Sequence, residues 1–240
     1  MLELWHEWNS VHSFKVRVVL AEKRLDWTGR RIELLKFEHL RPEYLKLNPN
    51  GVVPTLVHDG RVILESSVIC QYLDEEFPEP ALLPADPYGR ARARAWLKYF
   101  DEVVHPAVRA ASFQLLYRPL LSALPRVELM ARLAAHPDPA RARAFLDAPA
   151  DGLERAEGVF KAAIQRIESA LEGEWLVGSS FCLADIAMAS FAERLAHLRM
   201  EKLWEPYPRT RAWSAAVLAK ASVLASRAPD QYRFQLGATA

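Results

Sequence analysis

The chain of 240 residues is long enough for one large domain or two modest ones with a sizeable core. The hydrophobic fraction of 51% is ordinary for a soluble globular protein. The net charge of +1 gives no excess of positive charge that would attract nucleic acid or an anionic membrane. Two cysteines outside any CxxC pattern argue against a disulfide framework and predict no metal site. No leader pattern opens the chain and no apolar run could span a membrane, so a reducing cytoplasm is the expected compartment.

The first 77 residues alternate short strand patterns with helical patterns. Strands are predicted at residues 2–5, 31–35, 55–57 and 61–64, and helices at residues 11–25, 42–47 and from residue 65 onward. Asp59-Gly60, between the last two strands, is one of the strongest short hairpin signals. This β-α-β-α-β-β-α order predicts a mixed sheet with helices packed on it.

A proline-rich stretch, residues 78–87, predicts a linker because proline neither continues a helix nor donates to a sheet. Beyond it the pattern is helical almost to the end. Helices are predicted at residues 90–117 (one, or two that meet near Pro106), 121–135, 139–146, 153–171, 183–198 and 210–219. The predicted class is α+β, with an α/β domain at residues 1–77 and an all-helical domain at residues 88–240.

The start of the helix after the hairpin is a candidate anion site. Glu65-Ser66-Ser67 opens this helix with an acceptor side chain at the N-cap, and the first backbone N–H groups lack partners within the helix. Such a helix start is a ready receptor for a carboxylate or a phosphate. Pro54 stands just before the preceding strand, where no donor is required. These residues predict a small-molecule anion site at a sheet edge; the alternative is a plain helix cap.

Three motifs carry a family resemblance. Residues 48–56 read NPNGVVPTL, residues 65–73 read ESSVICQYL and residues 177–189 read VGSSFCLADIAMA. In this order and spacing the chain resembles the cytosolic glutathione transferases, and most of all their serine-type bacterial and fungal members. The segment HDGRVILESSVICQYLDEEFPE and the helical matter at residues 121–153 are also similar to bacterial β-etherases, which cleave lignin-type aryl ethers.

The resemblance implies a thioredoxin-like domain with a four-stranded sheet, a helical-bundle domain, a homodimer and glutathione as cosubstrate. The γ-glutamyl carboxylate would bind at Glu65 and Ser66. A cis Val53–Pro54 bond would turn the Val53 backbone toward the cysteinyl unit, and His39 would approach the glycyl end. One residue departs from the family pattern: Val52 stands where many relatives have Gln or Lys, so His39, Lys36 or Asn50 would compensate, or glutathione would bind weakly.

The chemistry implied by the resemblance needs glutathione's thiol as a thiolate. A free thiol has a pKa of ~8.5, and lowering it by about two units takes roughly 2.7 kcal/mol of preferential stabilisation. One hydrogen bond to a charged group supplies about 1.5–3 kcal/mol. Ser10 matches the catalytic serine of plant-type and zeta-like relatives, and Ser13 matches the serine of a β-etherase-like alignment; we favour Ser10. His12 is a further candidate to contact the thiolate or the substrate.

Three functions follow from these residues. The first is a glutathione transferase that acts on a hydrophobic electrophile, with neither nucleic acid nor a membrane as partner. The second is β-etherase-like cleavage of aryl ethers, and the third, suggested by Val52, is binding without turnover. The electrophile pocket is expected between the domains; the candidate linings are Tyr99, Val103, Val104, Val108, Phe113, Tyr117, Trp204 and Tyr207.

The motif CLADIAMA predicts the start of the buried helix at residue 183. It resembles the family's capping box, but Cys182 replaces the usual Ser or Thr, and a thiol is a poor acceptor. The expected loss is about 1 kcal/mol of stability. Asp185 is expected to accept from the Cys182 N–H, so the helix start is kept.

Overall fold

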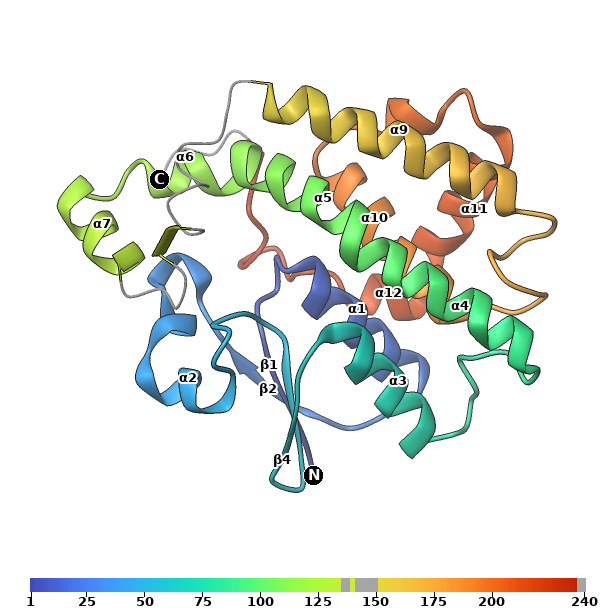
Figure 1. The fold of residues 1–240 in the computed structure, drawn as a ribbon, viewed down its shortest axis with the longest axis horizontal. Helices are drawn as coiled ribbons and strands as arrows, with labels where there is room; N and C mark the ends of the chain where they lie inside the picture. The colour runs from blue at the N-terminus through green and yellow to red at the C-terminus, as the bar shows by residue number, and fades with distance from the viewer. Residues whose placement is uncertain (135–138, 141–150, 237–240) are drawn as a thin grey trace.

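The computed structural model describes residues 1–134, 139–140 and 151–236 (Figure 1). Four strands form one sheet in the order β2-β1-β3-β4. β1 pairs with β2 in parallel and with β3 antiparallel, and β3 pairs antiparallel with β4. The predicted mixed four-stranded sheet is therefore confirmed. The strand bounds are β1 (Leu2–His6), β2 (Thr28–Arg31), β3 (Thr55–His58) and β4 (Arg61–Ile63).

Helices accompany the sheet, and after it every regular element of the described residues is a helix, so the α+β class is confirmed. The helices that accompany the sheet are α1 (Val11–Glu22), η1 (Leu34–Lys36), η2 (Glu38–Leu40), α2 (Pro42–Leu47) and α3 (Ser66–Glu76). The helical half has α4 (Pro87–Tyr99), η3 (Phe100–Val104), α5 (His105–Ser112), η4 (Phe113–Tyr117), α6 (Arg118–Leu121), α7 (Arg126–Ala134), α9 (Gly152–Ala170), α10 (Leu183–His197), η5 (Glu201–Trp204), α11 (Pro208–Ala219) and α12 (Ala221–Ala225). The helix predicted at residues 139–146 lies mostly outside the described residues. Within the described ranges, no helix is long and apolar enough to cross a membrane.

The hairpin forms where Asp59-Gly60 predicts it. Both residues have positive φ, 47° and 79°, as the two central positions of a type I′ turn require. The second strand, in contrast, is misplaced by the sequence: it covers Thr28–Arg31 and not residues 31–35. Its ladder with β1 ends near Ile32, whose N–H donates to the His6 carbonyl at 2.8 Å. The alternating pattern of residues 31–35 predicts a strand, but Leu34 begins the short helix η1, and both Leu34 and Leu35 line a cavity.

One long helical run, Pro87 to Leu121, spans the molecule in green in Figure 1. It is the single-helix alternative of the prediction for residues 90–117. Two turns, η3 and η4, have π-helical hydrogen bonding. Pro106 follows the first of them, and a wider turn accommodates a residue without an N–H. Such π segments are frequent at functional sites, and here they flank α5, which faces the cavity described below.

The sheet half and the helical half share one core. Helix α10 is buried almost throughout, as its apolar sequence predicts. Helix α1 packs against α10 and also buries a charge, which its apolar face did not predict. Lys15 is fully buried, and its Nζ donates to Ser67 Oγ at 2.6 Å and to Asp101 Oδ1 at 2.9 Å. This contact joins α1, α3 and η3, and so connects the two halves.

Asp185 organises the start of α10. Its Oδ2 accepts from the Cys182 N–H at 3.1 Å, as the capping-box prediction required. Its Oδ1 also accepts from the Leu176 N–H and from the Trp213 indole N–H, each at 2.9 Å. The carboxylate is fully buried. It therefore ties together the loop before α10, the first turn of α10 and helix α11.

Candidate functional site

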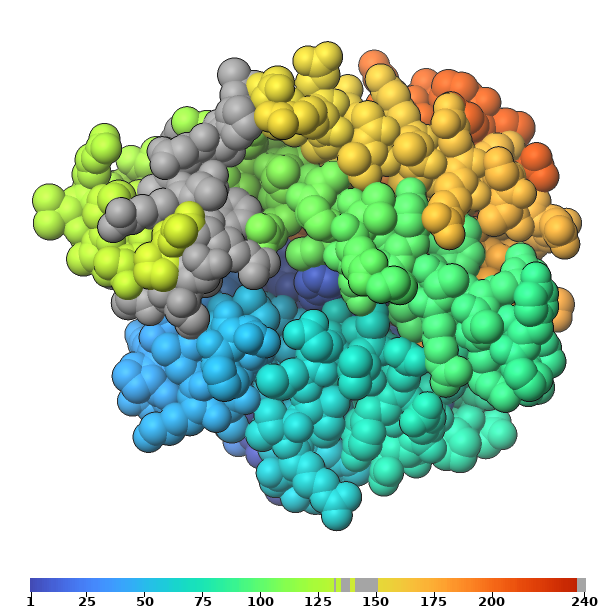
Figure 2. All heavy atoms as spheres, in the orientation of Figure 1, coloured from blue at the N-terminus to red at the C-terminus, as the bar shows by residue number. Residues whose placement is uncertain are grey.

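A cavity of about 710 Å³ lies between the sheet half and the long helical run. Figure 2 shows the molecule hollowed there, with dark-blue atoms of the early chain visible between the teal and green surfaces. One end is polar and the other apolar. Seven of the eight predicted site residues line it, and Ser13 does not; the seven are Ser10, His12, His39, Val53, Pro54, Glu65 and Ser66.

Ser10 is the N-cap of α1, and its Oγ accepts a hydrogen bond from the Ser13 N–H at 3.2 Å. Because the helix uses a lone pair of this oxygen, the hydroxyl hydrogen remains available to an anion in the cavity. Ser13 lies one turn later and is fully buried. Its Oγ has no partner within the described part of the chain. The geometry thus places Ser10 at the cavity and Ser13 in the core.

His12 links the Ser10 segment to the start of α3. Its Nδ1 lies 2.8 Å from Ser66 Oγ, and its ring packs on that of His105, with centroids 3.8 Å apart. Burial, together with the charges of Lys15 and Arg109, holds the pKa of His12 well below its usual range. Burial likewise lowers the pKa of His105. Both imidazoles are therefore neutral at physiological pH. With Nδ1 of His12 protonated, Ser66 keeps its hydroxyl hydrogen for an anion.

The Val53–Pro54 peptide is cis, as the family resemblance implies. Across the described residues, no hydrogen bond is made by the Val53 backbone N–H or C=O. The preceding carbonyl, of Val52, is held by the Tyr44 hydroxyl at 2.7 Å and the Asn48 amide at 2.8 Å. The hydrogen bonds to the Val52 carbonyl therefore fix the loop, while the N–H and C=O groups of Val53, which lines the cavity, are left without partners among the described residues.

Glu65 is the N-cap residue of α3, but its side chain does not cap the helix. Its side chain makes no capping hydrogen bond and is exposed at the cavity. Its backbone has φ 65° and ψ 112°, a sparsely populated region for a residue with a Cβ. The sequence suggested an acceptor side chain turned toward the helix, and the observed backbone directs the carboxylate away from that role. A plain helix cap is thus excluded for Glu65.

At the opposite edge of the polar end lie Val52 and His39. Val52 is 40% exposed and contributes no charge. The ring of His39 lies 6.0 Å from that of Phe37, nearly parallel to it, and both residues line the cavity. Lys36 forms an ion pair with Glu33 at 2.9 Å and does not line the cavity. Of the three predicted substitutes for the missing Gln or Lys, His39 and Asn50 reach the cavity.

The apolar end is built from both halves. Val108, Phe113 and Tyr117 line it as expected, whereas the other candidates lie outside it. Leu121 and Leu133 close this end and pack in a separate small cluster with Leu35 and Phe37. The helical matter after residue 121, which the sequence indicated as additional, therefore covers the apolar part of the cavity.

Sequence reasoning missed the polar residues that the helical half contributes. His105, Arg109 and Ser112 lie on one face of α5, and Arg194 of α10 is 5% exposed. Their spacing, four and three residues apart on α5, is a helical-face signal that could have grouped them. Nothing in the sequence indicates that Arg194 meets them across the interface.

Buried neutral histidines predict a stability that falls on acidification. Burial lowers the pKa of His6 to about 3 and that of His197 to about 4, besides the two cavity histidines. In the unfolded chain these groups titrate near pH 6.5, so stability is complete above that pH and declines below it. We expect urea unfolding to show a free energy that falls between about pH 6.5 and about pH 5, by about 1.4 kcal/mol per pH unit for each proton taken up.

The control is His6→Gln, which should reduce this slope. An unfolding free energy independent of pH in this range would contradict the burial of neutral imidazoles.

Family models match both halves of the chain. A model described as "Glutathione S-transferase, N-terminal domain" matches residues 8–81, and one described as "Glutathione S-transferase, C-terminal domain" matches residues 150–216. Protein LigF of Sphingobium sp. strain SYK-6 is 43% identical over 103 residues, which cover 42% of this chain and 40% of LigF. Maleylacetoacetate isomerase of Pseudomonas aeruginosa is 39% identical over 118 residues, which cover 48% of this chain and 56% of the isomerase.

These alignments span about half the length of the curated relatives. Over the whole fold, the crystal structure of β-etherase LigF from the same Sphingobium strain has a TM-score of 0.85 and 28% identity. That comparison covers 94% of this chain and 98% of LigF.

Proposed function

Since the chain belongs to the glutathione S-transferase family, we propose that it is a glutathione-dependent enzyme in which the Ser10 hydroxyl stabilises the thiolate. The electrophile would be a hydrophobic molecule bound at the apolar end. One observation carries the proposal: Ser10, the Val53–Pro54 edge and the start of α3 line the same cavity. We also propose a division into domains at residues 1–77 and 88–240.

The polar end supplies partners for each part of glutathione's γ-glutamyl and cysteinyl units. The start of α3 and the Ser66 hydroxyl would receive the α-carboxylate, since they offer donors at a helix N-terminus. The exposed carboxylate of Glu65 would receive the α-ammonium. The free N–H and C=O of Val53 would pair with the cysteinyl backbone as an added strand. These contacts would direct the thiol toward Ser10.

Thiolate stabilisation here requires a donor and no general base. A histidine whose pKa lies well below 6.5 is a weak base, which argues against proton abstraction by His12 or His105. A hydroxyl donor at the start of α1 supplies about 1.5–3 kcal/mol, and the helix dipole adds up to about 1. That sum matches the roughly 2.7 kcal/mol needed to lower the thiol pKa by about two units. We therefore give the role to Ser10.

A second candidate is cleavage of β-aryl ethers. It is favoured by the likeness to β-etherase LigF over nearly the whole fold and by the apolar cover formed by Leu121 and Leu133. The thiolate sulfur would form a bond to the carbon that carries the ether oxygen. The C–O bond would break with its electron pair on oxygen, and the phenolate would take a proton from water. The third hypothesis is a non-catalytic binding protein. It is supported by Val52, which supplies no polar group where many relatives have Gln or Lys.

A homodimer is part of the proposal. Exposed apolar side chains lie on α3, α4 and η3, at Val68 (51% exposed), Tyr88 (75%) and Val103 (44%). Contiguous apolar patches are typical of a contact surface, and these three side chains are candidates for one.

The proposal is tested by titrating the thiol of protein-bound glutathione through the ultraviolet absorbance of the thiolate. We expect its pKa to lie about two units below the free value of ~8.5. Turnover is then measured with a chlorodinitrobenzene and with a β-aryl ether that releases a fluorescent phenol. Release of the phenol would favour the β-etherase reading. An unshifted thiol pKa, no turnover and tight calorimetric binding of hydrophobic molecules would favour the binding protein.

A further inference from the structure

The end of the described chain returns to the loop that carries Ser10. Asn9 stands immediately before Ser10 and is 4% exposed. Its Nδ2 donates to the Tyr232 carbonyl at 2.7 Å, and its Oδ1 accepts from the Phe234 N–H at 3.0 Å. One amide side chain thus bonds to two alternate residues of the tail, as a neighbouring strand would. We call residues 232–234 the tail clamp.

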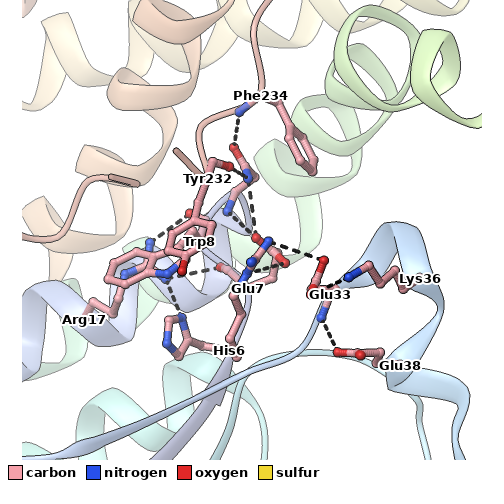
Figure 3. A network of polar contacts seen from close by, with 11 residues as sticks. His6, Glu7, Trp8, Arg17, Glu33, Lys36, Glu38, Tyr232 and Phe234 are labelled. Carbon is pink, nitrogen blue, oxygen red and sulfur yellow. Dashed lines mark hydrogen bonds and ion pairs between the residues drawn. The ribbon is translucent and has the colours of Figure 1, made fainter. Parts of the chain in front are cut away.

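Aromatic packing holds the tail clamp in place. Figure 3 shows Tyr232 beside Trp8 and Phe234 above them. The rings of Trp8 and Tyr232 are nearly parallel, with an interplanar angle of 5° and centroids 6.4 Å apart. The Arg31 guanidinium lies 4.0 Å from the Tyr232 ring centroid. At the other end, the Phe234 carbonyl lies 2.6 Å from His197 Nε2. Both ends of the clamp are therefore anchored.

Arg194 holds Asn9 from the opposite side. Its Nη2 donates to the Asn9 carbonyl, and its Nη1 donates to Ser112 Oγ at 2.8 Å. The Ser10 N–H, in turn, donates to the Glu7 carbonyl at 3.1 Å. The peptide that leads into Ser10 is thus bonded through both its side chain and its backbone, to partners 185 and more residues away.

A hydrogen bond to a thiolate weakens steeply when its angle or distance departs from the optimum. Ser10 begins α1, so the direction of its hydroxyl depends on the loop before it. A small pocket of about 30 Å³ lies beside this loop and is lined by Ser10 itself and by Asn9, Arg194 and Arg233 among others. We propose that Asn9, Arg194 and the tail clamp are positioning residues, which hold the Ser10 hydroxyl at the thiolate.

This inference rests on the proposed role of Ser10, and it separates positioning from glutathione binding. The residues proposed to bind glutathione stand on the loop before β3 and at the start of α3. In the part of the chain that the structure describes, no hydrogen bond or ring contact joins these residues to the tail clamp. Loss of the clamp should therefore change the state of the thiol more than the affinity for glutathione.

The test compares the 240-residue chain with a variant that ends at Gln231 and a control that ends at Leu236 and keeps the clamp. In the variant ending at Gln231 we expect the bound thiol's pKa to rise by about one unit, so kcat should fall about threefold at pH 7 and about tenfold at a pH well below both thiol pKa values. Raising the pH above the new thiol pKa should restore most of the rate, and KM for glutathione should change less than about threefold. The control should match the full chain.

Asn9→Ala in the full chain removes both bonds to the clamp and provides a second variant should the shortened chain fold poorly. It should raise the thiol pKa in the same direction. An unchanged thiol pKa and pH–rate profile in either folded variant would overturn the inference. Ser10→Ala in the same titration separates the two proposals: if it alone shifts the thiol pKa, the positioning role fails; if it shifts nothing, the role of Ser10 fails.

Discussion

Ser10→Ala is expected to lower kcat about 100-fold, the scale for removing one donor that stabilises an anion. The alanine variant keeps the cavity and the proposed glutathione contacts, so KM for glutathione should change little. The bound thiol should titrate close to the free value, and the rate should recover at high pH, where the thiol ionises without help. Steady-state kinetics across pH and the thiolate absorbance measure both effects.

Ser13→Ala is the matched control, because Ser13 carries the same hydroxyl three residues later but lies outside the cavity. It removes a buried hydroxyl that has no partner in the described structure, so stability should be unchanged or slightly higher. If Ser13→Ala abolishes turnover while Ser10→Ala is silent, the assignment of the serine is wrong. In that case the β-etherase-like alignment would be the better guide.

Local chemistry could be predicted well from the sequence. Asp59-Gly60 specifies a hairpin because few residues tolerate two positive φ values in succession. Asp185 follows Cys182 by three residues, the spacing at which a carboxylate reaches back to the N-cap N–H. The sequence also places a helix start at residue 65, and α3 begins at Ser66, although the Glu65 side chain does not make the expected capping bond. These features depend on neighbours in the chain, which a sequence displays directly.

The features that the sequence did not predict depend on partners that are distant in the chain. Lys15 and Arg17 are charged, which is typical of solvent-facing helix positions. Both are nevertheless buried, because oxygen atoms far away in the chain accept hydrogen bonds from them. The position of β2 depends on which residues meet β1, which its own pattern does not state. The tail clamp is the extreme case, since Asn9 and Tyr232 are separated by 223 positions. No local pattern marks such a pair.

Asp185→Ala should cause the largest loss of stability, with an unfolding free energy lower by about 4 kcal/mol. Three buried N–H donors would lose their acceptor, and each such loss costs about 1–3 kcal/mol. A competing effect reduces the sum: burial raises the pKa of Asp185, so keeping the carboxylate ionised there already costs stability. Urea unfolding near neutral pH measures the difference.

Asp185→Asn and Trp213→Phe resolve this loss into its parts. Asparagine keeps one oxygen for the Leu176 and Trp213 donors but turns an NH₂ group toward the Cys182 N–H, so about half of the loss should remain. Trp213→Phe should cost less in the Asp185→Ala background than in the wild type, because the indole has already lost its acceptor. Equal costs would show that the two side chains are not coupled.

Because α10 carries Arg194, a loosened helix start should also raise the pKa of the bound thiol in Asp185→Asn. Stability and thiolate formation would then share a cause, reaching Ser10 through the Asn9 carbonyl.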